Sequence, residues 1–571
     1  MDDKIKEKAL SWVPLFILIT IGLAIHLPGI NWGLMYKERL SLIFKDTEEI
    51  KRLSRKMEAW RREVYKNKAH FLGERCPSLN EDGTILDFSD EVLTETEVSG
   101  IRSYFVHTYN PDESRAFGVL SNIRPWKGSF NPHAFEYGGA YLYPLGLFLF
   151  LASLLKLVTL NPDLSYYFFH PEEMESLYVA GRMFSKIAVL GGVIILYLLG
   201  RRWLGKRAGF LAALFLLTSP LVLFEGHIMK PHIFCMFYSI LTLYATIKIL
   251  LEGRMIWYIL GGVGVGLTVG AGGYTAPIFL WLIIAHFLSD NKNRYLWLGT
   301  SILMAILTFI ITNPFYLLAF SEAKREFMFV YNKDVGGGTR MAAFSLSSFL
   351  QSIWTLKEAC SLGYPIYFLS ILGMIYALAR HRRIDIFFLL CLLSSLLPFL
   401  SGGYNRGSRF FLFIFPLFFL LGAMVADRCL SSLRFKKVAF LILVLILGYT
   451  AFYSFIYISG FVKEGSKDSS RLAAGRWINE YIPYGSTIGI QNFPHICDLP
   501  PFRFFNYKLR ITKDLSKGDL PPYLLLTSSS GLNSPQFDKY YKPLKVIEGI
   551  PFKHPNSVLN HNIEILIKKE K

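Results

Sequence analysis

The sequence predicts an α-helical protein that crosses a membrane many times, and three observations support this fold class. Of the 571 residues, 52% are hydrophobic and 16% are aromatic. Apolar runs of roughly 17–25 residues, enough to cross a hydrocarbon core about 30 Å thick, recur along the chain. Lys and Arg gather in the short connectors between these runs. We therefore predict about eleven transmembrane helices, an interfacial helix, a long first external loop and a small C-terminal α/β domain.

The apolar runs follow one another through most of the chain. The first run comes after a charged segment, residues 1–8, and has no small-residue cleavage site, so we interpret it as a retained membrane span. The runs are approximately 9–27, 139–159, 179–200, 207–224, 231–251, 256–272, 275–289, 295–312, 364–380, 384–401, 408–426 and 436–459.

The basic connectors set the predicted orientation. The positive-inside rule places all of them on the cytoplasmic side only if one early run does not cross. The run at 139–159 opens with Tyr141, Tyr143 and Pro144, which suits a helix in the outer interface. We therefore expect the N-terminus in the cytoplasm, and residues 28–178 and the C-terminal tail outside a plasma or inner cell membrane.

This orientation divides the chain into two predicted domains. Residues 1–459 form the transmembrane domain with its external loop, and residues 460–571 form the external α/β domain. Within the latter, residues 473–481 are helix-like and residues 487–491 and 523–527 are strand-like. In the external loop, the charged segment 48–68 suits a solvated amphipathic helix. The glycine run 336–338 suits a mobile lid.

Charge and cysteine usage exclude two other classes. The formal net charge is +18, but the basic residues lie beside apolar runs, as membrane orientation requires, so we exclude nucleic acid as a partner. None of the six cysteines forms a CxxC pair, so neither a zinc site nor a disulfide framework is indicated.

Two adjacent acids in the first external loop, Asp112 and Glu113, are the first candidates for chemistry. They follow Pro111 in the segment Tyr-Asn-Pro-Asp-Glu. Taken alone, this pattern also suits a solvated turn. Its predicted position on the outer face makes a second interpretation available, in which one carboxylate takes a proton from a substrate hydroxyl.

Further polar residues fall at the same predicted depth. Singly, each also suits a residue at the headgroup region, and Lys230 and Arg409 also suit side chains that reach toward lipid phosphates. Together, cations at a membrane surface can hold a phosphate and stabilise it as a leaving group. The candidate phosphate- and substrate-binding residues are Arg182, His227, Lys230, Tyr274, Arg406 and Arg409, and the candidate acceptor-loop residues are His133, Glu136 and Tyr137.

Several ordered motifs resemble the GT-C superfamily of integral-membrane glycosyltransferases. The resemblance is to glycosyltransferase family 39, the protein O-mannosyltransferase and aminoarabinose-transferase-like group, and it extends across roughly residues 20–320. The motifs, in order, are LPGINWGL, YNPDE, FNPHAFEYGGAYLY, GRMFSKIAVLGG, GHIMKPH, GGYTAP and TNPF.

The resemblance implies an activity and its partners. It implies a polyprenyl-phosphate-linked monosaccharide donor, an inverting displacement, and a glycan, lipid or protein acceptor. Asp112 matches the first acid of the family motif, which acts as general base, and Glu113 would orient the acceptor or the cations. No cofactor is required, although the carboxylate pair leaves room for a divalent cation, and no metal ligands are assigned.

The chain departs from the family pattern at two positions and carries one insertion. His232 stands where relatives often have an acid, and Gly273 stands where they often have a lysine. About 75 residues between Leu34 and Tyr109 have few counterparts in relatives, and we expect them to serve acceptor recognition.

Two alternative functions remain open on the sequence alone. A transporter or lipid flippase would place charges and broken helices at mid-membrane, whereas here the polar residues gather at one face. A polysaccharide polymerase or ligase would use a lipid pyrophosphate donor, which analysis of the bound lipid would reveal.

Overall fold

The computed structural model describes most of the chain, and its contacts divide it into two compact units. The described residues are 12–34, 36–66, 82–86, 95–290, 293–335, 346–358, 361–397, 408–432, 436–515, 520–527, 535–550, 559 and 562–569. Unit 1 comprises Met1–Leu27, Ala116–Leu151 and Gly181–Phe455, and unit 2 comprises Pro28–Arg115, Ala152–Ala180 and Ile456–Lys571. Each unit is described by itself below. The glycine run 336–338 and Arg406 lie outside the described residues.

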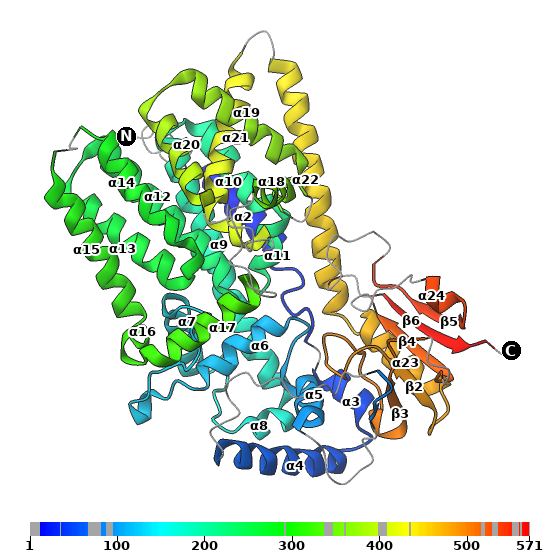
Figure 1. Cartoon of the computed structure of the whole chain (residues 1–571). Coiled ribbons are helices and arrows are strands. Elements are labelled where there is room, and N and C mark those ends of the chain that lie inside the picture. The colour runs from blue at the N-terminus through cyan, green and yellow to red at the C-terminus, as the bar shows by residue number, and fades with distance from the viewer. Residues whose placement is uncertain are drawn as a thin grey trace. The chain divides into compact units, whose positions relative to one another are not determined.

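Unit 1 is a bundle of apolar helices (Figure 1), and each predicted apolar run is helical over most of its described residues. Among the described residues, five helices are long and apolar enough to cross a membrane: α9, α12, α15, η4 with α21, and α22. The helices of this bundle are α2 (Val13–His26), α7 (Gly139–Leu154), α9 (Pro171–Trp203), α10 (Lys206–Thr218), α11 (Pro220–Gly226), α12 (Pro231–Glu252), α13 (Met255–Ala271), η2 (Gly273–Ile278), α14 (Phe279–Leu288), α15 (Tyr295–Thr312), α16 (Phe315–Leu318), α17 (Phe320–Val335), α18 (Leu346–Thr355), α19 (Tyr364–Arg380), α20 (Arg383–Leu396), η4 (Ser408–Ile414), α21 (Phe415–Ser431) and α22 (Lys436–Glu464).

A bend separates α10 from α11 within one apolar run. Their axes differ by 57°, so the pair forms either a broken span or a re-entrant segment. Ser219 lies at the break in an extended conformation, and Pro220 begins α11. Proline has no N–H to donate to the preceding turn, which explains why the helix breaks here. The break directs the residues after α11 into a buried connector, residues 227–230, before α12 begins.

Small residues allow close helix packing in unit 1. Helices α12, α13 and α15 lie side by side (Figure 1). A Cβ placed on Gly262 of α13 would lie 2.2 Å from the Ser301 carbonyl oxygen of α15. Such close backbone approach is typical of helices that associate in membranes. Asn313, at the end of α15, accepts a hydrogen bond from the Gly139 N–H at 2.7 Å and so fixes the first turn of α7.

The start of α7, which we predict to be the interfacial helix, packs through glycine against α13. Pro144 lies inside this helix, whose described length is 16 residues. At the residue before α7, a Cβ on Gly138 would lie 1.9 Å from the Gly270 carbonyl oxygen. Only the absence of a side chain lets these two backbone segments meet.

Unit 2 combines helices of the predicted external loop with a mixed six-stranded sheet. Its helices are α3 (Tyr36–Ile43), α4 (Thr47–Lys66), α5 (Glu95–Val106), α8 (Leu164–Phe169), α23 (Ser470–Tyr481), η5 (Phe504–Asn506) and α24 (Pro535–Asp538), together with the start of α6 (Pro111–Leu120). The strand order is β1-β3-β2-β4-β6-β5. The strands are β1 (Ile85–Leu86), β2 (Thr487–Ile490), β3 (Lys508–Ile511), β4 (Tyr523–Thr527), β5 (Tyr541–Ile547) and β6 (Ile563–Lys568).

The predicted C-terminal elements are present, and the sheet also includes a strand from the predicted external loop. Helix α23 and strands β2 and β4 agree with the predicted segments within a few residues. Strand β1 pairs antiparallel with β3, with Ile85 opposite Arg510. Leu524, Leu526 and Leu566 belong to the apolar core of the sheet. The segment after residue 459 therefore packs together with residues 28–115 in unit 2.

The contact between Gly138 and Gly270 gives a stability prediction. Gly138→Ala should lower the free energy of unfolding by about 1–3 kcal/mol, because the added methyl group meets backbone that cannot move away as a side chain would. Gly273→Ala is the matched control, since a Cβ there would meet nothing within 4 Å. Thermal unfolding of the purified protein in detergent compares the two. Equal melting temperatures for both variants would contradict the packing argument.

Candidate active site and phosphate-binding residues

The acidic pair opens helix α6, and the local sequence explains why. Pro111 supplies the fixed backbone angle that suits a first helical position, and Asp112 and Glu113 occupy the first turn, where negative charge is favourable. Asn110 precedes them, and its side-chain oxygen accepts a hydrogen bond from the Asp112 N–H at 3.0 Å. The segment Asn-Pro-Asp-Glu therefore begins a helix and does not form a simple solvated turn.

The two acids lie in different environments. Glu113 is fully buried, and the Thr108 hydroxyl donates a hydrogen bond to its carboxylate at 2.7 Å. Asp112 is partly exposed. A buried, hydrogen-bonded carboxylate suits a supporting role, and a partly exposed one can be reached by a substrate. The roles predicted from the sequence, with Asp112 as base and Glu113 as the orienting acid, stay predictions.

Two buried arginines hold the segment that precedes α6. The Arg39 guanidinium donates hydrogen bonds to the carbonyl oxygens of Gly33 and Leu34 at 2.8 Å, of His107 at 2.8 Å and of Tyr104 at 3.3 Å. The centre of the same group lies 5.2 Å from the Tyr109 ring centroid. It thus joins α3 to the residues just before the acidic pair.

The second arginine comes from the C-terminal part of unit 2. Arg471, in the first turn of α23, lies with its guanidinium carbon 4.0 Å from the Tyr109 ring centroid. It also donates to the Glu464 carboxylate at 2.9 Å, and both side chains of this ion pair are buried. We call Arg39, Tyr109, Arg471 and Glu464 the arginine–tyrosine clamp.

Unit 1 gathers buried cations around the connector 227–230. Helix α9 packs closely on this connector: a Cβ on Gly181 would lie 2.1 Å from the Met229 sulfur, and the Ser185 hydroxyl donates to the Ile228 carbonyl at 3.0 Å. Arg182 and Lys186 flank these contacts one helical turn apart, and both are buried. Two cations of α9 therefore lie beside the connector.

The connector contributes further basic groups. His227 is fully buried, with Nδ1 2.8 Å from the Leu223 carbonyl oxygen, and its ring stacks on His26 of α2 at 6.0 Å. Lys230 is 3% exposed and immediately precedes α12. Glu225, in α11, is 2% exposed and brings a carboxylate to the same region. We call Arg182, Lys186, His227 and Lys230 the connector cluster.

The two positions that depart from the family pattern both adjoin Tyr274. His232 contacts it through space, and Gly273 precedes it in the sequence. His232 Nδ1 is 2.8 Å from the Tyr274 hydroxyl. Gly273 is exposed and precedes that tyrosine. Arg409 lies over Phe410, whose ring contacts both His232 and Tyr274, and the charges of Glu225 and Arg409 both act on the Tyr274 hydroxyl.

The predicted acceptor-loop residues are held by helix α17. His133 Nδ1 lies 3.0 Å from the Glu322 carboxylate. The backbone N–H groups of Phe135 and Glu136 donate to the two oxygens of Glu326 at 2.9 and 3.1 Å. Tyr137 is buried at 9% exposure. These residues thus form one ordered loop ahead of α7, within unit 1.

Sequence reasoning did not single out two members of this arrangement, Lys186 and His26. The signal for Lys186 was present, because a lysine one turn after an arginine inside an apolar helix is unusual. His26 ends the first apolar run, and its neighbours in the sequence give no indication of the stacking on His227. That contact depends on the fold.

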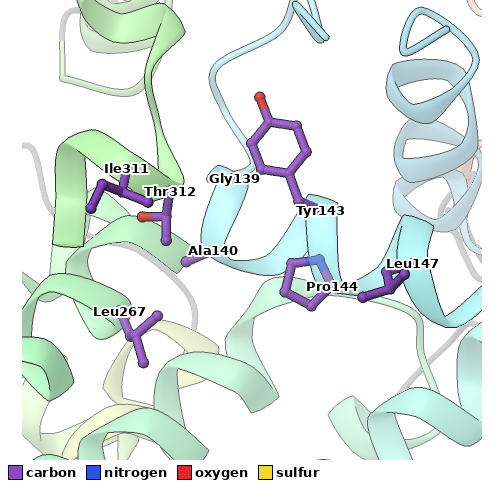
Figure 2. Close-up of a pocket in the computed structure, with 8 residues that line it drawn as sticks. All are labelled: Gly139, Ala140, Tyr143, Pro144, Leu147, Leu267, Ile311 and Thr312. Atoms are coloured by element: carbon purple, nitrogen blue, oxygen red, sulfur yellow. The ribbon is translucent and has the colours of Figure 1, made fainter. Parts of the chain in front are cut away.

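An apolar groove lies beside the first turn of α7 (Figure 2). Its volume is about 320 Å³. Figure 2 shows Tyr143, Pro144 and Leu147 of α7 on one side and Leu267 and Ile311 on the other.

Among the described residues, no group of three or more His, Cys, Asp or Glu side chains is arranged to hold a metal ion. Metal independence stays a prediction, which titration with EDTA would test.

Comparison with known proteins gives a family for part of the chain. Residues 174–313 match the family described as dolichyl-phosphate-mannose-protein mannosyltransferase. The matched stretch contains Arg182, Lys186, His227, Lys230 and Tyr274. This match confirms the predicted resemblance to the GT-C superfamily. The match, together with the long apolar helices, supports a membrane glycosyltransferase of the GT-C type.

Solved structures of low sequence identity are also similar. ArnT from Cupriavidus metallidurans, bound to undecaprenyl phosphate, is 12% identical, with a TM-score of 0.46 over 82% of this chain and 97% of ArnT. The Archaeoglobus fulgidus oligosaccharyltransferase, in complex with Zn and sulfate, is 15% identical, with a TM-score of 0.44 over 70% of this chain and 58% of that chain. The comparison with curated proteins gave no significant match.

The buried ion pair of the clamp gives a second stability prediction. Arg471→Met should destabilise the protein by about 3–5 kcal/mol, because it leaves the Glu464 carboxylate buried without its guanidinium. Adding Glu464→Gln should recover part of the loss. Arg476→Met, at an exposed position of the same helix, is the control. Thermal unfolding in detergent measures all three. A melting temperature for Arg471→Met equal to that of the control would refute the pairing argument.

Proposed function

We propose that this glycosyltransferase moves a monosaccharide from a polyprenyl-phosphate carrier to an acceptor hydroxyl on the outer face of a cell membrane. The observation that carries the proposal is the connector cluster. Three buried cations lie around the connector 227–230, namely Arg182, Lys186 and Lys230. One buried acid, Glu225, belongs to the same region. A phosphate attached to a long isoprenoid is an anion that enters such a region from the bilayer.

The proposed reaction divides the work between acid and cations. The Asp112 carboxylate takes the proton from the acceptor hydroxyl, and the oxygen forms a bond to the anomeric carbon of the sugar. The bond from that carbon to the phosphate oxygen breaks, and the polyprenyl phosphate leaves with the electron pair. Arg182, Lys186 and Lys230 stabilise the negative charge of the leaving phosphate. The displacement inverts the anomeric configuration.

Two observations support a polyprenyl-phosphate donor. The family matched by residues 174–313 is named for a dolichyl-phosphate-linked sugar donor, and the connector cluster lies inside that stretch. The apolar groove beside α7 belongs to the same unit and has an apolar lining, although the proposal does not depend on its occupant. Because Gly273 stands where relatives often have a lysine, the donor phosphate is left to these remaining cations.

Replacing the proposed base tests the acid–base step. Asp112→Asn should lower transfer about 10²–10⁴-fold and leave donor binding unchanged, because the amide cannot accept the proton but keeps the shape of the side chain. Transfer is measured with radiolabelled polyprenyl-phosphate sugar in membranes that contain the full chain. Asp163→Asn, at the exposed start of α8, is the control. Undiminished transfer by Asp112→Asn would remove this residue from the mechanism.

Replacing a buried cation tests the phosphate site. Lys186→Met should weaken binding of polyprenyl phosphate about 10–100-fold, the loss of one charge-assisted hydrogen bond worth about 1.5–3 kcal/mol. Lys206→Met, at an exposed position of α10, is the matched control. Binding of tritiated polyprenyl phosphate to the protein in nanodiscs compares them. Equal affinity for both variants would show that Lys186 serves the fold alone. Movement of the lipid across the bilayer without sugar transfer would instead support a flippase.

A further inference from the structure

A loop of the C-terminal segment, residues 493–499, is fastened to helix α5 in unit 2. The Ile496 N–H donates to the Ser103 hydroxyl at 3.1 Å, and the Tyr104 hydroxyl donates to the Leu499 carbonyl at 3.0 Å. A Cβ on Gly100 would lie 2.4 Å from the Pro494 carbonyl oxygen. Glycine at this position of α5 therefore lets the loop approach the helix backbone. These contacts fix a segment that is almost 400 residues from α5 along the chain.

The loop held against α5 carries three polar side chains, those of His495, Cys497 and Asp498. They lie near His107 and near Asp112, in the first turn of α6. The rings of His495 and His107 lie 5.9 Å apart. The charges of Asp498 and Asp112 both act on the Cys497 sulfur. His107, His495, Cys497 and Asp498 are all partly exposed, as is Asp112. We call His107, His495, Cys497 and Asp498 the 495–498 surface.

The protonation states of these side chains determine which hydrogen bonds the 495–498 surface can make. Burial lowers the pKa of His107 to about 3, with His495, Arg102 and Arg39 adding to the effect. Burial also lowers the pKa of His495, although Asp498 opposes this. Burial raises the pKa of the Cys497 thiol to about 12. At neutral pH both imidazoles and the thiol are therefore uncharged, and each neutral imidazole carries one donor and one acceptor nitrogen.

We propose that the 495–498 surface binds the acceptor, and that this acceptor is a neutral, hydroxyl-bearing molecule presented to Asp112. The proposal rests on the proposed function, because it takes Asp112 as the base. The Cys497 N–H donates to His495 Nδ1 at 3.2 Å, so the proton of the neutral His495 ring is on Nε2, which can donate to a hydroxyl oxygen, while the Asp498 carboxylate can accept from the hydroxyl. The carboxylates of Asp112 and Asp498 and the guanidinium groups of Arg39, Arg102 and Arg471 all act on Cys497 or His107, so this mixture of charges favours neither an anionic nor a cationic acceptor. His495 and Asp498 are then specificity-determining residues.

The ratio of sugar transfer to donor hydrolysis tests this assignment. Membranes containing the full chain receive radiolabelled polyprenyl-phosphate hexose, and label is measured in acceptors and as free sugar. His495→Ala and Asp498→Asn should each lower the transfer-to-hydrolysis ratio about tenfold, because the acceptor is lost while donor binding and the base remain. Label in the protein fraction identifies a Ser or Thr hydroxyl, and label in glycan or lipid fractions identifies a sugar hydroxyl.

Two matched variants control for nonspecific effects, and each outcome bears on the proposal. His170→Ala and Asp468→Asn change the same residue types at exposed positions of unit 2 and should leave the ratio unchanged. An unchanged ratio for His495→Ala and Asp498→Asn overturns the proposal. So does an equal fall of transfer and hydrolysis, which would indicate a structural role. Absence of any donor consumption by the unmodified chain refutes the proposed function and this inference with it.

Discussion

Burial of charged side chains in an otherwise apolar chain is the constraint on which both units depend. Taking one ion out of water costs several kcal/mol unless charges and hydrogen bonds replace the water. In unit 2, the buried Arg39 guanidinium donates hydrogen bonds to four backbone carbonyl groups, and the buried Arg471 forms an ion pair with Glu464. These contacts offset the cost of burial. In unit 1, the cations of α9 lie against the connector that carries His227 and Lys230. Such residues persist in a fold where they have a use.

In the arginine–tyrosine clamp, the buried charges fix the position of the segment that precedes α6. Arg39 comes from α3, Tyr109 from the segment before α6, and Arg471 from α23, so three distant stretches of the chain meet at one aromatic ring. The Gly33 N–H donates to the Glu464 carbonyl at 3.1 Å and strengthens the same junction. Because Asn110 and Pro111 follow Tyr109 directly, holding the ring also fixes where α6 begins. The orientation of Asp112 thus depends on residues far from it in sequence.

Local sequence predicted the elements well, and it failed where the fold joins distant segments. The apolar runs are helical over most of their described residues, because a segment that crosses lipid must satisfy its backbone N–H and C=O groups within itself. Strands β2 and β4 were predictable because they are short apolar segments that prolines separate from their neighbours. Strand β1 was not, because its two residues, Ile85 and Leu86, become a strand only by pairing with β3. The stacking of His26 on His227, and the ion pair between Glu464 and Arg471, likewise leave no local pattern.

The acidic pair illustrates what the structure adds to a motif. Two adjacent carboxylates repel each other, and sequence alone cannot say which one the fold keeps in contact with solvent. The helical geometry of α6 separates them, since successive residues of a helix point in directions about 100° apart. Glu113 therefore turns inward to the Thr108 hydroxyl while Asp112 stays partly exposed. Because the clamp fixes the start of the helix, this division of the pair follows from the same buried arginines.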